Sequence, residues 1–373
     1  MASILGIIFS NIHSKEVFEI TQVRTIASAP IGGRYRLIDF TLSSLVNHGV
    51  NHIGVITKSN FQSLMDHVGS GKEWDLARKT GGLVILPPYG INEDTIYNTR
   101  LEALKRIISF INNAKEEYVI LTDCYHVCNF DFSDLIDFHI QKNADITCVY
   151  RTQKITNDSY YFPANTFVLA PNKRVVSIDI VDTVNEEANV SADIWVLKRE
   201  LLVSLVLDAM NFNSQSFSKD ILRQNVNNLK IYGYKFSGYF GNISSLQSYY
   251  DVNMQLLKKE VRQELFEVKG RSIYTKVRDS APTLYCQNAK ITNSLIADGC
   301  IIDGTVENSI LFRGVKVGKG TVIKNSILNQ DTEVSDNTTI EYVVTDKNVK
   351  IHNKKEIKGS ANHLIYVKKD ASI

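Results

Sequence analysis

The sequence predicts an α/β domain built on a parallel sheet, followed by a left-handed parallel β-helix of hexapeptide repeats. Two observations support this prediction. Short apolar segments alternate with amphipathic segments from residue 4 to residue 150, which is the pattern of a doubly wound sheet with helices on both faces. From residue 271 onward, aliphatic residues recur at every sixth position, which is the repeat of a β-helix whose coils stack on one another.

Buried strands and amphipathic helices are expected in turn along the first part of the chain. The opening segment, Ile4–Phe9, is short and apolar, which predicts a fully buried strand. Apolar residues at helical spacing precede Gly49, so a helix is expected to end there. In such Rossmann-like sheets, ligands lie outside the carboxyl ends of the strands. The other expected elements are strands at 53–57, 83–86, 118–121 and 145–150, and helices at 38–49, 59–68, 100–110 and 135–140.

The pattern is less regular between residues 151 and 243. Residues 244–266 have the apolar spacing of one long amphipathic helix. We therefore divide the chain into a first domain over residues 1–243, a linking helix over 244–268 and a β-helix over 269–373. The expected elements of the irregular part are strands at 166–169, 175–180 and 194–197, a helix at 200–210 and a helix that opens at Phe217.

The coils of the β-helix are predicted from aliphatic residues that point inward, one on each flat side. Such coils bury a core only by stacking, so a role as scaffold or oligomer contact is expected rather than an independent active site. Acyltransferases use the same coils, usually with a catalytic histidine, but His352 and His363 lie outside a clear coil. The repeating positions are Ile296, Ile302, Leu311, Val317, Ile323, Leu328, Val334 and Ile340.

Composition limits the classes of partner. The 373 residues carry a net charge of only +2, so neither nucleic acid nor an anionic membrane is expected to bind. No apolar segment approaches the length of a membrane span. The five cysteines form no paired zinc pattern, although Cys124 and Cys128 could be read as half of a metal site. Reduced thiols in a cytoplasmic protein are the expected alternative.

One string carries a resemblance to a known family. Residues 30–40 read P-I-G-G-R-Y-R-L-I-D-F, which resembles the F-G-G-K-F-R-I-I-D-F signature of bacterial and plant ADP-glucose pyrophosphorylases, also called glucose-1-phosphate adenylyltransferases. The resemblance covers essentially the whole chain and is closest to the GlgD-type second subunit, which pairs with a catalytic subunit in some bacteria. It implies a GT-A-like nucleotidyltransferase domain in front of the β-helix.

The resemblance also shows which nucleotide-binding parts differ. The family's G-G-x-G-x-R-L loop follows the first strand, but residues 10–16 here contain neither glycine nor arginine. Glycine supplies the backbone conformations that cradle a polyphosphate. A family lysine that neutralises phosphate corresponds to Ile26. The family's G-T-A-x-A motif corresponds to residues 99–103, where Thr99 replaces the glycine and Arg100 is bulky.

The metal-binding motifs differ as well. The G-D-H motif, whose aspartate holds Mg²⁺ in the family, corresponds to residues 123–125, so Asp123 is displaced by one position and Cys124 takes the place of the acid. The second metal carboxylate of the family corresponds to Asn242. Adenylyl transfer depends on a metal ion, cationic side chains and backbone donors. We therefore expect no catalytic residue and no bound metal or cofactor in this chain, with Mg²⁺ used by a catalytic partner.

Other family positions are retained. Arg36 matches an arginine implicated in binding a sugar-phosphate effector, Arg24 has a family counterpart, and Arg313 and Lys316 lie on the β-helix near an arginine-bearing family stretch. Together they are expected to form an effector pocket between the two domains. The alternative is that Arg34 and Arg36 pair within the fold. A vestigial sugar-phosphate cleft is expected at Ser191, within the counterpart of the family's S-M-G-I-Y strand, and at Lys219 and Asp220.

The resemblance and the lost parts together predict a regulatory, catalytically degenerate subunit of glucose-1-phosphate adenylyltransferase that supports glycogen biosynthesis. Such a subunit is expected to assemble with a catalytic subunit, as a heterotetramer in the cytoplasm. Two alternatives remain open at this stage. One is an active adenylyltransferase with a divergent site, and the other is a sugar-phosphate-sensing homo-oligomer that has no catalytic partner.

Overall fold

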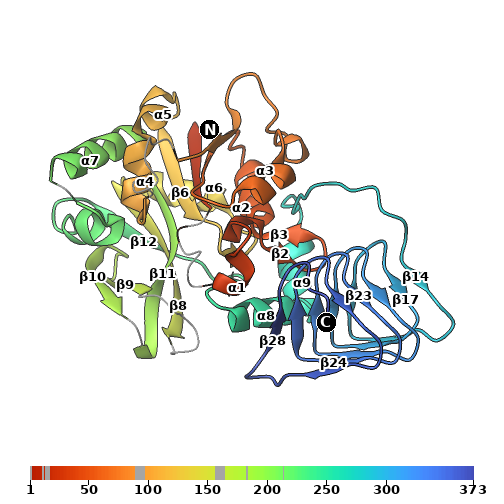
Figure 1. The fold of residues 1–373 in the computed structure, drawn as a ribbon. Coiled ribbons are helices and arrows are strands. Elements are labelled where there is room, and N and C mark those ends of the chain that lie inside the picture. Colours follow the sequence, from red (N-terminus) through yellow and green to blue (C-terminus); the bar gives the residue numbers. More distant parts are fainter. Residues whose placement is uncertain are drawn as a thin grey trace.

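The computed structural model describes residues 2–10, 12, 17–88, 97–155, 164–181, 184–212 and 214–373. Most of the loop at residues 10–16 therefore lies outside the described residues. Figure 1 shows a sheet domain with helices on its faces, lying beside a β-helix, with two short helices at the junction. This arrangement confirms the predicted fold class.

The sheet of the first domain is mixed, which corrects the prediction of a wholly parallel sheet. The first four of its strands in chain order (β1, β4, β5 and β6) are parallel to one another. β11 is antiparallel to both β6 and β8, so the later part of the sheet reverses. The strands are β1 (Ile4–Phe9), β4 (His52–Ile56), β5 (Gly82–Leu86), β6 (Tyr118–Asp123), β8 (Ile146–Ile155), β9 (Ala164–Leu169), β10 (Val175–Val181), β11 (Val184–Lys198) and β12 (Ile231–Lys235).

Helices cover both faces of this sheet, and each face has its own apolar core. Alternate residues of one strand enter different cores, as Ile120 and Leu121 of β6 do. The predicted helix over 100–110 is in fact two helices, because the chain leaves the helical path at Ile107. The helices are α1 (Phe18–Thr21), α2 (Leu37–Asn47), α3 (Gln62–Val68), α4 (Arg100–Arg106), α5 (Ile108–Asn113), α6 (Phe132–Gln141), α7 (Arg199–Asn211) and the π-helix η4 (Phe217–Arg223).

The linking segment is also two helices, so the prediction of one long helix is wrong. α8 (Leu246–Gln255) ends before Lys258, whose extended backbone (φ −80°, ψ 132°) begins α9 (Lys259–Phe266). The guanidinium of Arg262 donates to the carbonyl oxygens of Leu256 and Leu257, each at 2.8 Å. These bonds satisfy carbonyl groups that the end of α8 would otherwise leave without partners. The domain boundaries at residues 243 and 268 stay predictions.

The β-helix has three parallel sheets of five strands each. The six-residue register is confirmed, because Leu311, Val317 and Ile323 lie on successive strands, one in each sheet, and all belong to the core of the β-helix. Its strands are β14 (Leu284–Tyr285), β15 (Lys290–Thr292), β16 (Leu295–Ile296), β17 (Ile301–Ile302), β18 (Thr305–Glu307), β19 (Ile310–Leu311), β20 (Lys316–Val317), β21 (Val322–Lys324), β22 (Ile327–Leu328), β23 (Glu333–Val334), β24 (Thr339–Glu341), β25 (Val343–Thr345), β26 (Lys350–Ile351), β27 (Glu356–Lys358) and β28 (Ile365–Val367).

The two domains share a packed interface. Ile310, Ile327 and Val344 of the β-helix belong to the same apolar cluster as one face of the first domain. α8 lies between the domains, since the hydroxyl of Tyr249 donates to Pro30 O at 2.8 Å and that of Tyr250 donates to Asn325 O at 2.9 Å. Within the described part of the chain, no helix has the length and apolar character needed to cross a membrane.

Candidate functional site

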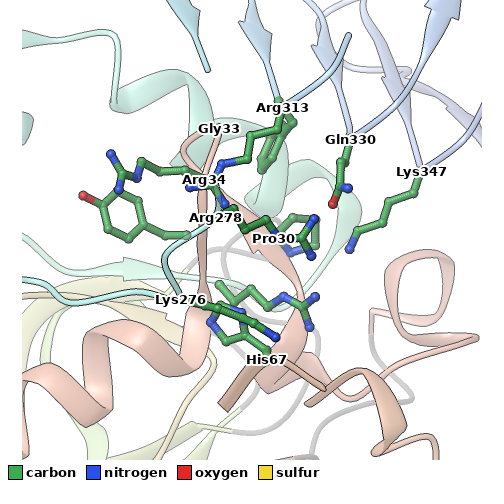
Figure 2. Close-up of a pocket in the computed structure, with 12 residues that line it drawn as sticks. Pro30, Gly33, Arg34, His67, Lys276, Arg278, Arg313, Gln330 and Lys347 are labelled. Atoms are coloured by element: carbon green, nitrogen blue, oxygen red, sulfur yellow. The ribbon is translucent and has the colours of Figure 1, made fainter. Parts of the chain in front are cut away.

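A cationic pocket lies where the first domain meets the β-helix (Figure 2). It is formed by the hairpin of β2 (Pro30–Ile31) and β3 (Tyr35–Arg36), by α3, by the irregular chain before β14 and by one edge of the β-helix. Among the described residues that line it, six are lysine or arginine and none is acidic. The lining residues are Pro30, Gly33, Arg34, Tyr35, Arg36, His67, Lys276, Arg278, Phe312, Arg313, Gln330 and Lys347.

The β-helix presents three of these residues from one corner of successive coils. Leu311 pairs with Leu328, and Leu328 pairs with Thr345, so each coil advances the chain by 17 residues (311 to 328 to 345). Arg313, Gln330 and Lys347 each follow these strand positions by two residues (313, 330 and 347), and they therefore stack in register. Figure 2 shows all three side chains extending from the coils toward the same space.

The first domain contributes a fixed arginine. Arg36 is 8% exposed, and its Nη1 donates to Ser63 O at 2.5 Å and to Ser63 Oγ at 2.9 Å. The carboxylate of Asp39 accepts from the backbone N of Arg36 at 2.9 Å and lies 2.5 Å from His67 Nε2. The nearest acid is thus used by the backbone and by a histidine, and it forms no ion pair with the Arg36 guanidinium among the described residues.

The electrostatics of the pocket favour an anion. Of the six cations, Arg313 alone has a carboxylate partner in the described part of the chain, with Nε 3.0 Å from Asp298 Oδ2. Burial, followed by the charges of Arg36 and Arg24, lowers the pKa of Lys347 to about 7. Burial also lowers the pKa of Arg36 to about 10. Like charges that depress one another in this way are relieved when a phosphate or sulfate enters between them.

Two of the four predicted effector residues, Arg36 and Arg313, line this pocket. The expectation that Arg24 and Lys316 join them needs correction. Arg24 is only 3% exposed and lies 2.7 Å from Asp346 Oδ1, so its charge is already used at the domain interface. Lys316 is exposed on β20 and pairs with Glu333 at 2.7 Å, outside the pocket lining.

Sequence reasoning missed several lining residues. Gln330 and Lys347 could have been found from Arg313, because they recur at the 17-residue coil period given above. Lys276 and Arg278 lie on chain without helix or strand, where no periodic pattern marks them.

A second site, the strand-end cleft, lies where the carboxyl end of β6 meets the middle of β11, where the vestigial cleft was expected. Arg100, the first residue of α4, extends between two buried carboxylates. Its Nη2 lies 2.6 Å from Asp193 Oδ2 and also contacts Asp123 Oδ2, while its Nε lies 3.2 Å from both oxygens of Asp123. Burial opposes the charge of Arg100, but Asp123 and Asp193 more than compensate and raise its pKa.

The other predicted cleft residues do not all meet here. Ser191 Oγ lies 3.2 Å from Asp193 Oδ1, so Ser191 borders the site. Asp220 instead accepts from the backbone N of Gln215 at 2.8 Å and of Ser216 at 2.9 Å, which fixes the start of η4. Lys219 is exposed on η4. The expectation of a shared cleft is therefore corrected for two residues. Lys219 faces solvent, and Asp220 stabilises the local fold.

The three positions expected to have lost catalytic groups are buried or only partly exposed. Ile26 is 2% exposed and packs in the core. Cys124 is fully buried, its Sγ donates to Phe9 O at 3.3 Å, and burial raises its thiol pKa. Asn242, in β13 (Gly241–Asn242), has two buried polar side-chain atoms without a hydrogen-bond partner. Among the described residues, no group of three or more histidine, cysteine or acidic side chains has a metal-binding arrangement.

Comparison with known proteins gives consistent matches over both domains. Residues 6–259 match the nucleotidyl transferase family, and residues 282–363 match the GlmU-like C-terminal hexapeptide family. The chain is 33% identical to the glycogen biosynthesis protein GlgD of Bacillus subtilis over 98% of this chain and 95% of that protein. It is 33% identical to GlgD of Geobacillus stearothermophilus over 86% of this chain and 82% of that protein. It is 32% identical to the glucose-1-phosphate adenylyltransferase of Pseudothermotoga lettingae over 87% of this chain and 77% of that protein.

Proposed function

This chain belongs to the nucleotidyl transferase family that includes GlgD proteins and glucose-1-phosphate adenylyltransferases, and we propose that it acts there as a non-catalytic, regulatory subunit. In this proposal it assembles in the cytoplasm with a catalytic adenylyltransferase subunit, as a heterotetramer. The partner binds Mg²⁺ and makes ADP-glucose from ATP and glucose 1-phosphate. This chain sets how that synthesis responds to an effector, and so supports glycogen biosynthesis.

The position of Arg100 is the observation that supports the proposal that this chain is non-catalytic. Adenylyl transfer develops charge on phosphate oxygens, and a metal ion held by carboxylates commonly stabilises that charge. Here both carboxylates of the strand-end cleft, Asp123 and Asp193, already bind the guanidinium of Arg100. A divalent cation would have to displace a buried cation from its ligands. Ile26, which supplies no charge, stands where the resembling family has a lysine.

The cationic pocket supports the regulatory part. Six positive side chains from both domains surround it, and no acid is found among the described residues of the lining. An anion such as a sugar phosphate would bind both walls together and so favour one placement of the β-helix against the first domain. A ligand of this kind acts by its different affinity for the two placements, and a subunit contact then transmits the preference to the partner.

Co-expression with a catalytic glucose-1-phosphate adenylyltransferase tests the proposal. We expect the two chains to elute together on size-exclusion chromatography, and the effector dependence of ADP-glucose synthesis to differ from that of the catalytic subunit alone. Separate elution with an unchanged effector response would overturn the proposal. That result would favour a homo-oligomeric sensor.

The affinity of the pocket for a divalent anion is expected to fall as the pH rises through the Lys347 pKa of about 7. Above this pH, Lys347 loses the proton that attracts the anion, so the affinity falls by up to about tenfold per pH unit. Sulfate is a suitable probe for calorimetric titration, because its own charge is constant from about pH 6 to about pH 9, the range in which Lys347 titrates.

Matched variants separate this effect from a general change in charge. Lys347→Met should bind sulfate weakly at low pH and lose most of the pH dependence. Lys316→Met removes the same charge outside the pocket lining and should behave as the unsubstituted chain. A wild-type sulfate affinity that stays constant across this pH range would contradict the assignment of Lys347 to anion binding.

A further inference from the structure

We propose that Arg100, Asp123, Asp193 and Tyr125 form an arginine plug, a built-in contact that closes the strand-end cleft to divalent cations. The inference deepens the proposed function and rests on it, because it assigns the loss of metal binding to one removable side chain. The four residues come from α4, β6, the turn after β6, and β11. No single sequence motif contains all four.

The plug occupies the carboxylate oxygens that a metal ion would need as ligands. The Arg100 guanidinium lies 2.6 Å from Asp193 Oδ2 on one side and 3.2 Å from both Asp123 oxygens on the other. The hydroxyl of Tyr125 donates to the same Asp193 oxygen at 2.7 Å. The side chains of Asp123 and Asp193 are 1% and 7% exposed. A second cation would therefore meet occupied ligands and a like charge in a poorly solvated place.

Asp193 is held in a backbone conformation that favours glycine. Its φ is +54°, in the left-handed region where a side chain is unfavourable. The S-M-G-I-Y strand that this segment resembles has glycine at this position. The contacts of the Asp193 side chain to Arg100, Tyr125 and Ser191 offset the cost of this backbone conformation. A strained residue that binds a buried arginine indicates that the two side chains function as a pair.

Arg100 is placed unfavourably as well. It occupies the first position of α4, where the partial positive charge of the helix N-terminus repels a cation. Its guanidinium also lies 5.3 Å from the centre of the Trp195 ring, so packing holds the side chain across the cleft. Two unfavourable placements, one on each partner, are compensated only when Arg100 and Asp193 meet.

Two polar side chains beside the plug point to a site that could hold an ion once the plug is removed. His126 is 2% exposed and its Nδ1 has no hydrogen-bond partner in the described structure. Burial lowers the pKa of His126 to about 4, against the opposing charges of Asp123 and Asp193. Asn242 pairs with His126 across the β7 (His126–Val127) and β13 ladder, and both of its side-chain polar atoms are also unpartnered. Imidazole and amide oxygen are both common metal ligands.

Manganese binding by the full chain tests the plug, measured by titration with electron paramagnetic resonance of free Mn²⁺. We expect the unsubstituted chain to bind Mn²⁺ weakly and Arg100→Ala to bind it at least about tenfold more tightly, because two buried carboxylates are released. The variant Arg100→Ala, Asp123→Asn, Asp193→Asn should return to weak binding, since it lacks both the plug and the acids. This readout needs no enzymatic activity, so it can fail independently of the proposed function.

Two results would overturn the inference. One is no gain in Mn²⁺ affinity in a folded Arg100→Ala, and the other is a gain that persists in the triple variant. If Arg100→Ala does not fold, the double variant Arg100→Ala, Asp193→Gly is titrated with Mn²⁺ in its place. That variant relieves the strained backbone and leaves Asp123 as the released acid, so no gain in Mn²⁺ affinity there also overturns the plug.

Discussion

Replacing Asp346 by asparagine is expected to lower the free energy of unfolding by about 3–5 kcal/mol, because it leaves the charge of Arg24 buried without its partner. Arg24 Nη2 lies 2.7 Å and 3.0 Å from the two oxygens of Asp346, and both side chains are 3% exposed. The same carboxylate accepts from the hydroxyl of Tyr366 at 3.0 Å and from the backbone N of Lys347 at 2.7 Å. The loss therefore affects the domain interface and the position of Lys347 in the cationic pocket.

Urea unfolding followed by circular dichroism measures this effect. Glu333→Gln breaks the exposed pair with Lys316 on the same β-helix and is the matched control. An exposed pair contributes only about 0–1 kcal/mol, so the control should unfold near the unsubstituted chain. If the two variants lose the same free energy of unfolding, burial of the Arg24–Asp346 pair does not determine how much that pair contributes to stability.

Replacing Arg36 by alanine is expected to weaken sulfate binding by about 10- to 100-fold, the range that one hydrogen-bonded charge contributes. Arg36 is fixed by Ser63 through Nη1 alone, and neither its Nε nor its Nη2 has a partner among the described residues. It can therefore donate to an anion without breaking an ion pair. In the complex with a catalytic partner, the same variant should lose most of the effector response.

Calorimetric titration of Arg36→Ala with sulfate is the direct measurement, and circular dichroism checks that the variant retains the secondary structure of the unsubstituted chain. Lys316→Ala is the control, since Lys316 lies outside the pocket lining. Unchanged sulfate affinity and an unchanged effector response would assign Arg36 to the fold. In that case its contacts with Ser63 and the backbone contact with Asp39 would be its whole role.

Sequence patterns predicted the fold correctly where they repeat along the chain. They did not predict features that depend on contacts between residues far apart in the sequence. The aliphatic repeat led directly to the three-sided β-helix, because each coil uses the same positions. The reversal of β11 was not predictable from its apolar pattern, since a buried strand has the same composition in either direction. The break between α8 and α9 was missed because Arg262 stabilises it from outside the turn.

The candidate sites divide in the same way. Arg36 could be found because it lies in a recognisable string, and Arg313 because it lies on the β-helix near an arginine-bearing stretch of the resembling family. Arg24 has the same residue type, but its burial against Asp346 is a long-range contact that the sequence does not show. The same holds for Arg100 and Asp193, which are 93 residues apart in the chain. The sequence indicated that the cleft had lost metal ligands, whereas the structure places two carboxylates there with an arginine between them.

The most direct test of the central claim is the release of pyrophosphate by the purified chain alone, supplied with ATP, glucose 1-phosphate and Mg²⁺. With Arg100 in the strand-end cleft and Ile26 in place of a cation, we expect turnover at least about 10³-fold below that of a catalytic subunit assayed identically. Addition of the catalytic subunit should restore synthesis and show an altered effector response. Turnover by the isolated chain at a rate comparable to that of the catalytic subunit would contradict the account.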